Sequence, residues 1–177
     1  MSLDLLVFSK DKAPKDPMEF LKWFHKKALW QGDRDYNDIK GTDQPLVDFF
    51  MEMIKTYPSM NGPYAPSDED FEQDPELEDS PYLTDYCIDD DLIYMSMAYS
   101  VADGEFVQKL AFKYGLGFCN MFHIYTDENT KLPLPQLSQS ESLAEDKKPE
   151  KKKSFLQDCS ENNRWERENG LYLRDAK

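Results

Sequence analysis

The sequence predicts an α+β domain, in which helices pack on a mainly antiparallel four-stranded sheet in the order β-α-α-β-β-α-β, followed by a C-terminal tail. Three observations support this fold class. Apolar residues recur at intervals of three and four in three segments, which is typical of amphipathic helices. Short runs rich in branched and aromatic residues lie around them, as expected of strands. The length of 177 residues suits one domain with a core and an appendage.

The first half of the predicted domain is a strand followed by two helices. The apolar run LDLLVFS at 3–9 predicts a central strand. In the first helix, Asp16 is a suitable N-cap, Pro17 suits the first helical position, and Glu19 can reach back to the cap. The clearest helix follows a polar loop, and Pro58 ends it. Its apolar residues at helical spacing are Leu46, Phe49, Phe50, Met53, Ile54 and Tyr57.

The second half is predicted to contain three strands and one helix. LTDYCI at 83–88 and LIYMSMAYS at 92–100 are β-prone, and the three aspartates at 89–91 predict a hairpin turn between them. A helix at 103–115 ends on a glycine, and GFCNMFHIY at 117–125 predicts the fourth strand. The apolar positions of that helix are Phe106, Val107, Leu110, Ala111 and Tyr114.

Composition divides the chain into three parts. Residues 1–126 are predicted to form the α+β domain, which contains an acidic insertion at 58–82. Residues 127–153 are rich in Pro, Ser and Lys, so we expect a linker there. Apolar side chains return at 154–177, which predicts a helical tail that docks on its own domain or on a partner.

Negative charge is concentrated in about a third of the sequence. The formal net charge is -14 at pH 7. No basic residue lies between Lys55 and Lys109, whereas 14 acidic residues do, and the rest of the chain carries 21 acidic and 21 basic residues. Such a field repels nucleic acid and anionic lipid and attracts basic proteins or cations. We therefore expect a protein partner with a basic surface, and neither nucleic acid nor a membrane.

A cytoplasmic location is expected from the apolar runs and the cysteines. No run approaches the ~20 apolar residues of a membrane span, and the first residues lack the basic start and long apolar stretch of a signal peptide. Cys87, Cys119 and Cys159 form no CxxC pair, and their odd number leaves one unpaired in any disulfide scheme. A reducing compartment fits this pattern best.

Motifs for catalysis, metals or cofactors are not found in the sequence. His25 and His123 have no second histidine at ligand spacing, and phosphate-binding glycine loops and a GxSxG elbow are missing. The acidic insertion lacks the glycine that makes the ligands of a calcium loop converge. We therefore expect no enzyme activity, no cofactor and no metal site.

The acidic insertion allows three interpretations. It is a solvated loop without a partner, a loose cation site, or a protein-binding surface. The third is favoured because aromatic residues alternate with the acids, and together they supply steering charge and anchors for a basic protein. The predicted partner-binding residues are Tyr64, Asp68, Glu69, Asp70, Glu72, Asp74, Glu76, Tyr82, Tyr86, Asp89, Asp90 and Asp91.

Several blocks within residues 1–125 resemble a family of small, little-characterised bacterial proteins. The blocks are DLLVFSKDKAP, FLKWF, TDYCIDDDLIYMSMAYSVAD and KYGLGFCNM, together with the more specific DYND, MNGP and TDY. Members of such families are often encoded with interbacterial toxins. The resemblance therefore implies an immunity protein.

The resulting hypothesis is a cytoplasmic immunity protein that blocks a cognate toxin by binding it through the acidic, tyrosine-containing surface. A nuclease toxin would fit, because its phosphate-binding site is basic and an acidic inhibitor can imitate the nucleic-acid backbone. Two alternatives stay open. One is an adaptor module in a secretion or regulatory complex. The other is a small carboxylate- or cation-dependent enzyme, which requires acids that converge in a pocket instead of acids splayed on a convex loop and a hairpin turn.

Overall fold

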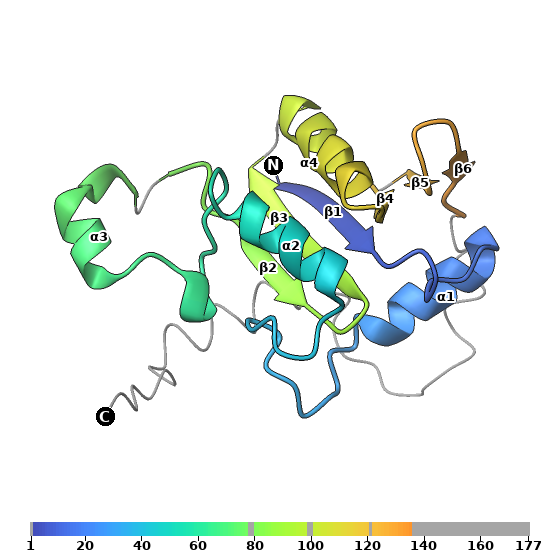
Figure 1. Ribbon diagram of the computed structural model, residues 1–177, viewed down its shortest axis with the longest axis horizontal. Coiled ribbons are helices and arrows are strands. Elements are labelled where there is room, and N and C mark those ends of the chain that lie inside the picture. The colour runs from blue at the N-terminus through green and yellow to red at the C-terminus, as the bar shows by residue number, and fades with distance from the viewer. Residues whose placement is uncertain (1, 78–79, 99–100, 121, 136–177) are drawn as a thin grey trace, which may run out of the picture. The chain divides into compact units, whose positions relative to one another are not determined.

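A six-stranded antiparallel sheet with the strand order β2-β3-β1-β4-β5-β6 forms the centre of the fold (Figure 1). This computed structural model describes residues 2–77, 80–98, 101–120 and 122–135. The strands are β1 Ser2–Phe8, β2 Asp85–Ile88, β3 Leu92–Ala98, β4 Gly117–Cys119, β5 His123–Tyr125 and β6 Lys131–Pro133. β1 and β3 pair along their whole length, with Leu5 opposite Met95, so they form the central pair of strands in the sheet.

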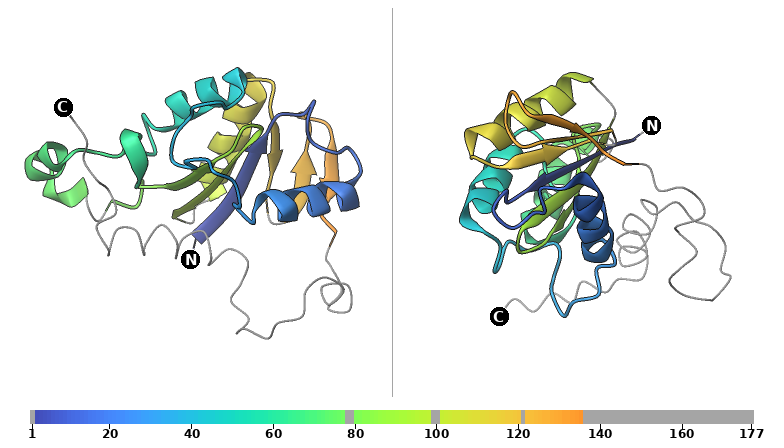
Figure 2. Two further views of the ribbon diagram at one scale, coloured as in Figure 1. Left: turned by 90° about the horizontal axis from the view of Figure 1, so that it is seen from below. Right: turned by 90° about the vertical axis from the view of Figure 1, so that its right-hand side faces the viewer.

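Helices cover both faces of this sheet (Figure 2). Within the described residues, the helices are α1 Pro17–Lys27, α2 Gln44–Met53, α3 Asp68–Gln73 and α4 Val101–Lys113, with short 3₁₀ helices η1 Gly62–Tyr64 and η2 Pro75–Leu77. Successive side chains of a strand point to opposite faces. Val7 of β1 belongs to the core cluster that α2 and α4 contribute to, whereas Phe8 packs against Phe20 of α1 with ring centroids 4.9 Å apart.

The main core lies between the sheet and the pair α2 and α4. Four side chains of α2 have no exposed surface, namely Leu46, Phe49, Phe50 and Met53. They repeat at three and four residues, so the apolar stripe seen in the sequence is the buried face of the helix. The predicted N-cap of α1 is also confirmed, because the Asp16 carboxylate accepts the N–H groups of Met18 and Glu19 at 3.0 Å each.

The α+β class and the antiparallel sheet are confirmed, but the predicted four strands and their order are wrong. The run predicted as one final strand is divided at Asn120. Its side-chain oxygen accepts the N–H groups of Phe122 and His123 at 2.9 and 2.8 Å. This turn separates β4 from β5, which then pair with each other.

A second side-chain turn adds β6. Asp127 accepts the N–H groups of Asn129 and Thr130 at 2.8 Å each, and the chain then returns along β5. β6 lies inside the range predicted as a linker, and it belongs to the compact unit Met1–Pro135. The rest of the predicted linker and the predicted helical tail lie outside the described residues.

The acidic insertion also contains regular structure that the predicted order lacks, namely η1, α3 and η2. The predicted hairpin between β2 and β3 is confirmed, because their register is antiparallel and the Asp89 N–H donates to the Leu92 carbonyl at 2.8 Å. Among the described residues, no helix has the length and apolar character needed to cross a membrane.

Candidate functional site

The acidic lobe, which we define as residues 67–77, carries charge on the surface and contributes nothing to the core. All six of its carboxylate side chains are exposed, and neither α3 nor η2 has a buried residue. The six are Asp68, Glu69, Asp70, Glu72, Asp74 and Glu76. Figure 1 shows α3 standing away from the sheet. Among the described residues, these acids form no group of three converging carboxylates.

Local hydrogen bonds hold the acidic lobe together in place of a core. Ser67 and Asp70 form a capping box, in which the Asp70 carboxylate accepts the Ser67 N–H at 2.7 Å and Ser67 Oγ accepts the Asp70 N–H at 3.2 Å. The hydrogen bonds from Ser67 lower the pKa of Asp70. Asp74 accepts the Glu76 N–H at 3.2 Å. Asp70 and Asp74 therefore stabilise the lobe itself, whereas Glu69, Glu72 and Glu76 are the acids to alter in a binding test.

Replacing Ser67 by alanine is expected to loosen the acidic lobe without changing global stability. Loss of an N-cap typically costs about 1 kcal/mol of helix stability, but α3 buries no side chain against the domain. The amide of Phe71, which donates to the Ser67 carbonyl at 3.2 Å, should exchange with solvent roughly fivefold faster. Hydrogen exchange measures this, and Ser67→Thr is the control that keeps the cap. If Ser67→Ala also lowered the urea midpoint of unfolding of the whole domain, the lobe would instead be part of the core.

The root of the lobe is fixed where the insertion leaves and re-enters the sheet. The Met60 N–H donates to the Thr84 carbonyl at 2.9 Å, and the Asn61 side chain donates to Asp85 at 2.9 Å. Gly62 has φ +75°, and a Cβ there would lie 2.6 Å from the Cβ of Asn37. The blocks DYND, MNGP and TDY therefore meet in space, and their shared role in this structure is to anchor the lobe.

The three predicted tyrosines occupy different environments. Tyr82 is 53% exposed, Tyr64 is half-buried against Phe50, and Tyr86 is only 1% exposed. The Tyr86 hydroxyl donates to the Tyr57 carbonyl at 2.9 Å, and burial raises the pKa of the Tyr86 phenol. The expectation that Tyr86 lies at a partner interface is therefore corrected. Tyr86 belongs to the core. All four residues of β2 are buried, so the strand has no alternation of buried and exposed residues from which the position of Tyr86 could be predicted.

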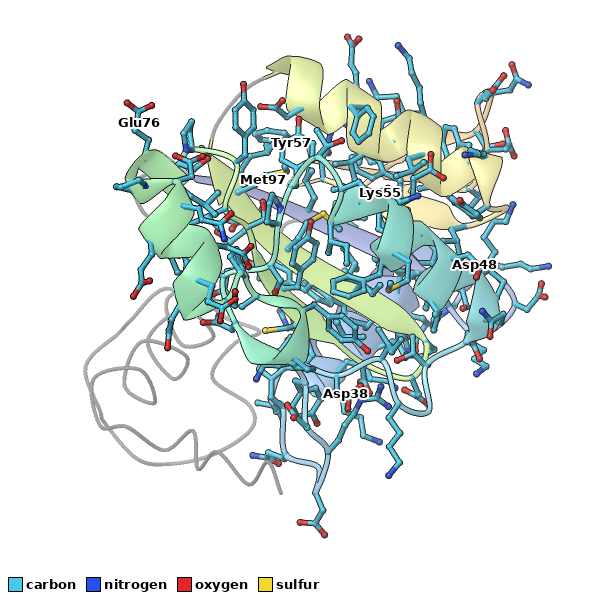
Figure 3. All side chains as sticks on the ribbon, turned by 60° about the vertical axis from the view of Figure 1, so that its left-hand side comes forward. Asp38, Asp48, Lys55, Tyr57, Glu76 and Met97 are labelled. Atoms are coloured by element: carbon cyan, nitrogen blue, oxygen red, sulfur yellow. The ribbon has the colours of Figure 1, made fainter. Side chains whose placement is uncertain are left out.

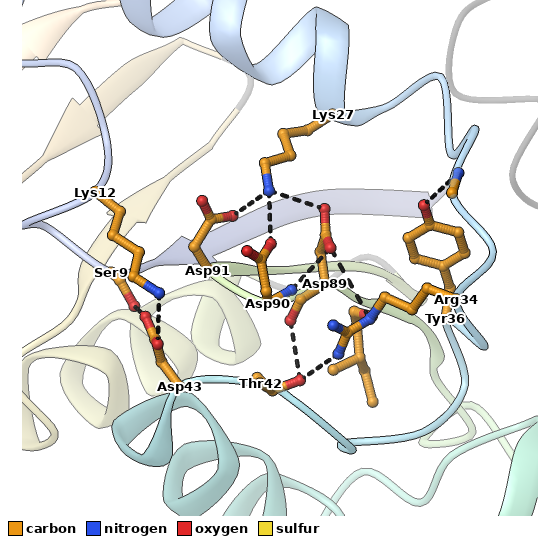
Figure 4. Close-up of polar contacts among 12 residues, drawn as sticks. Ser9, Lys12, Lys27, Arg34, Tyr36, Thr42, Asp43, Asp89, Asp90 and Asp91 are labelled. Carbon is orange, nitrogen blue, oxygen red and sulfur yellow. Dashed lines mark hydrogen bonds and ion pairs between the residues drawn. The ribbon is translucent and has the colours of Figure 1, made fainter.

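The three aspartates at 89–91 are not splayed on the hairpin turn, which corrects a second expectation. Their carboxylates converge on the ammonium group of Lys27 (Figure 4). Lys27 Nζ lies 3.3 Å from Asp89, 2.6 Å from Asp90 and 2.9 Å from Asp91. Asp89 and Asp91 are buried and Asp90 is half-buried. We call these four residues the Lys27 centre.

Hydrogen bonds from two segments to its backbone carbonyls hold the turn in this position. The Ser9 N–H donates to the Asp91 carbonyl at 2.9 Å, and the Asp43 N–H donates to the Asp90 carbonyl at 2.8 Å. The Thr42 hydroxyl donates to the Asp89 carbonyl at 3.0 Å. The loop after β1, the start of α2 and the turn between β2 and β3 therefore meet at one point, to which α1 adds Lys27.

Electrostatics at the Lys27 centre favour the ionised lysine. Burial disfavours the charged ammonium, but the hydrogen bonds and charges of the aspartates outweigh burial and raise the pKa of Lys27 well above its ordinary value. Burial opposes ionisation of Asp90, yet Lys27 lowers the pKa of Asp90 to about 2. For Asp91 burial dominates and raises the pKa, although the carboxylate lies beside the same cation.

The Lys27 centre has the ligand types of a cation site, but a side chain occupies it. One oxygen from each aspartate lies within 4.8 Å of the others. This is the spacing from which carboxylates bind a divalent ion, and the Lys27 ammonium stands where that ion would lie. The alternative hypothesis of a small carboxylate- or cation-dependent enzyme requires carboxylates that converge in a pocket. Here they are compensated by a cation of the same chain, so the arrangement is that of a structural ion pair.

A cleft of about 410 Å³ lies between the loop after β1, the start of α2 and the residues that follow α4. Its main acid, Asp43, accepts hydrogen bonds from Ser9 at 2.7 Å and from Lys12 at 2.6 Å. These bonds lower the pKa of Asp43 although burial acts against them. The carboxylate is therefore already paired within the chain.

Three aromatic side chains contact one another through Tyr57, and only Tyr82 among them was predicted to bind a partner. The Tyr57 ring contacts the Tyr82 ring at 5.9 Å and the Phe106 ring at 5.7 Å between centroids. Phe106 is 37% exposed, although its helical spacing predicted a core position. Tyr57 is buried and its hydroxyl donates to the carboxylate of Asp103. We call Tyr57, Tyr82 and Phe106 the aromatic trio.

Comparison of this chain with protein-family models, with curated proteins and with solved structures gives no match. Function is therefore argued from the chemistry of the described surfaces.

Proposed function

We propose that this protein binds a basic protein through the acidic lobe and Tyr82, and that it acts as a cytoplasmic immunity protein by covering a functional surface of a cognate toxin. The observation that carries the proposal is the lobe itself. It gathers six exposed carboxylates on a segment in which no residue is fully buried, and Tyr82, which follows in the sequence, is exposed as well. Like charges on one exposed segment repel each other, and a partner of opposite charge would relieve this repulsion.

The lobe has the properties of an electrostatic docking element. Complementary charge raises the rate of encounter, and buried aromatic anchors supply much of the affinity of an interface. No Lys or Arg lies between Lys55 and Lys109 in the sequence, so the acids of the lobe have no basic residue near them along the chain. A nuclease is the toxin class that fits best, since a surface that binds phosphates is basic and accepts carboxylates in their place. The resemblance of residues 1–125 to proteins encoded with toxins favours this use over a general adaptor.

The proposal is tested by capture of the partner from cells that encode the protein, at low and moderate salt. The binding variant is Glu69→Lys, Glu72→Lys and Glu76→Lys, which spares the capping acids. The control variant is Asp11→Lys, Asp33→Lys and Glu128→Lys, which changes net charge equally at exposed acids outside the lobe. We expect a basic partner whose capture falls with salt, and whose affinity drops on the order of 100-fold in the lobe variant alone.

The captured protein should also be toxic when expressed without this chain and harmless when both are expressed. A captured partner that is not toxic would favour the adaptor function. Equal loss of capture in both variants would mean that net charge, not the lobe, governs binding. No partner in either buffer would leave the acidic segment as a solvated loop and overturn the proposal.

A further inference from the structure

A half-buried carboxylate without a cationic partner lies against the aromatic trio. Asp103 of α4 accepts the hydroxyl of Tyr57, and within the described residues it forms no ion pair. Its neighbour Glu105 is 3.9 Å from Lys109, but both side chains are largely exposed, so that pair is weak. Among the residues that the structure describes, no cation compensates the negative charge of Asp103.

The aromatic side chains around this carboxylate are held in place while two of them remain accessible. Tyr57 is fixed by its hydrogen bond to Asp103, by the Tyr86 hydroxyl on its carbonyl, and by ring contacts on both sides. Tyr82 and Phe106 use Tyr57 as a common support and keep 53% and 37% of their surface exposed. Burial and the bond to Asp103 raise the pKa of Tyr57, so its hydroxyl stays a donor at all physiological pH values.

The turn before Tyr82 connects this region to the acidic lobe. The Ser80 N–H donates to the Leu77 carbonyl at 3.1 Å, and the Tyr82 N–H donates to Ser80 Oγ at 3.3 Å. These two hydrogen bonds link Tyr82, through Ser80, to Leu77, the last residue of the lobe. Figure 3 shows Tyr57 and Glu76 on the same side of the molecule.

From this geometry we infer that Tyr82, Phe106 and Asp103 form a recognition site for an arginine side chain of the partner protein. A guanidinium group is planar, stacks on aromatic faces and pairs with a carboxylate through two parallel N–H bonds. Tyr82 and Phe106, which both pack on the Tyr57 ring, supply the aromatic groups, and Asp103, three residues before Phe106 on α4, supplies the carboxylate. A lysine ammonium can also contact the rings and pair with the carboxylate, but it cannot form two parallel N–H bonds to it. Arginine is therefore expected to bind more tightly. The inference rests on the proposed function, for which it names the chemistry of the anchor.

The first test does not need the natural partner. Synthetic peptides Arg-Ala-Arg-Ala-Arg, Lys-Ala-Lys-Ala-Lys and the citrulline analogue of the first are titrated into the full chain, and aromatic NMR signals are followed. We expect the rings of Tyr82 and Phe106 to shift with the arginine peptide, less with lysine, and not with citrulline, which has the same shape without charge. Equal shifts with arginine and citrulline, or none at these rings, would overturn the inference.

Variants then assign the effect to the site. Phe106→Leu keeps apolar volume but removes the ring, and Asp103→Asn removes charge but keeps an acceptor for Tyr57. Each is expected to weaken binding of the arginine peptide about three- to tenfold. Phe122→Leu is the matched control. Phe122 directly precedes β5 and is 66% exposed, and its replacement should not change binding of the arginine peptide. Equal losses in Phe106→Leu and Phe122→Leu would contradict the site.

The two proposals can fail separately. If a basic partner is captured through the acidic lobe but binds Phe106→Leu as well as the unaltered chain, the arginine site is wrong and the proposed function stands. If the arginine peptide shifts the rings but no partner is captured, the site stands and the proposed function is wrong.

Discussion

Replacing Phe50 by alanine is expected to lower the free energy of unfolding by about 3–5 kcal/mol, the typical cost of removing a fully buried aromatic side chain. Phe50 has no exposed surface. Its ring contacts Tyr86 of β2 at 5.1 Å and Tyr64 of η1 at 5.2 Å, both edge to face. One side chain of α2 therefore joins the sheet to the start of the acidic insertion, and its loss leaves a cavity that both neighbours border.

Urea unfolding measures the global effect, and hydrogen exchange measures the local one. The Met60 amide, which bonds to Thr84 at the root of the lobe, should lose protection in Phe50→Ala. Met51→Ala is the matched control, because Met51 is on the same helix but 41% exposed, and it should change stability by about 0.5 kcal/mol or less. Similar losses in the two variants would mean that the cavity collapses and that Phe50 does not support the root.

The sequence was informative wherever contacts are local. The apolar stripe of α2 and the cap of α1 depend on residues within one or two helical turns, so their pattern predicts them directly. β4, β5 and β6 have only three residues each, and the side-chain turns at Asn120 and Asp127 create them. A run of apolar residues does not reveal such a division, which is why one long strand was predicted.

The same distinction applies to the candidate surfaces. The acids of the lobe are expected to be exposed, because apolar residues do not recur around them at helical or strand intervals. The Lys27 centre could not be predicted, because Lys27 and Asp90 lie 63 residues apart and only the packing of α1 over the hairpin turn joins them. Phe106 was misassigned for a related reason. Its spacing fits the apolar stripe of α4, but the Phe106 side chain packs on the Tyr57 ring and stays partly exposed.

Replacing Lys27 by methionine is expected to lower the free energy of unfolding by about 2–4 kcal/mol at neutral pH. The substitution leaves three neighbouring carboxylates without their shared cation, and the side chains of Asp89 and Asp91 are only 12% and 9% exposed. The value is set below that of a fully buried pair, because the Lys27 side chain keeps 25% of its surface exposed and water screens part of the charge. Methionine retains the length of the apolar stem, so the loss reports the charge.

The pH dependence gives this prediction a definite sign. In the unaltered protein the pKa of Asp90 is about 2, below its ordinary 3.8, so the stability that Asp90 contributes is present above pH 3.8 and is lost as the pH falls toward 2. Asp91 has a raised pKa and contributes in the opposite sense, because its protonated form fits the folded state better. In Lys27→Met the carboxylates lose their cation and protonate more readily. The difference in stability between the two proteins should therefore be largest at neutral pH and shrink as the pH falls from about 5 to 2.

Urea unfolding at several pH values measures this difference, and Lys12→Met is the control. Lys12 pairs with Asp43 at 2.6 Å, but it is exposed, so its removal should change stability little at any pH. A Lys27→Met protein as stable as the unaltered chain at neutral pH would mean that the backbone bonds from Ser9, Thr42 and Asp43 hold the turn by themselves. A deficit that persists unchanged in acid would assign the loss to packing of the lysine stem. Only a deficit that disappears on protonation of the carboxylates establishes that the Lys27 charge holds the three aspartates together.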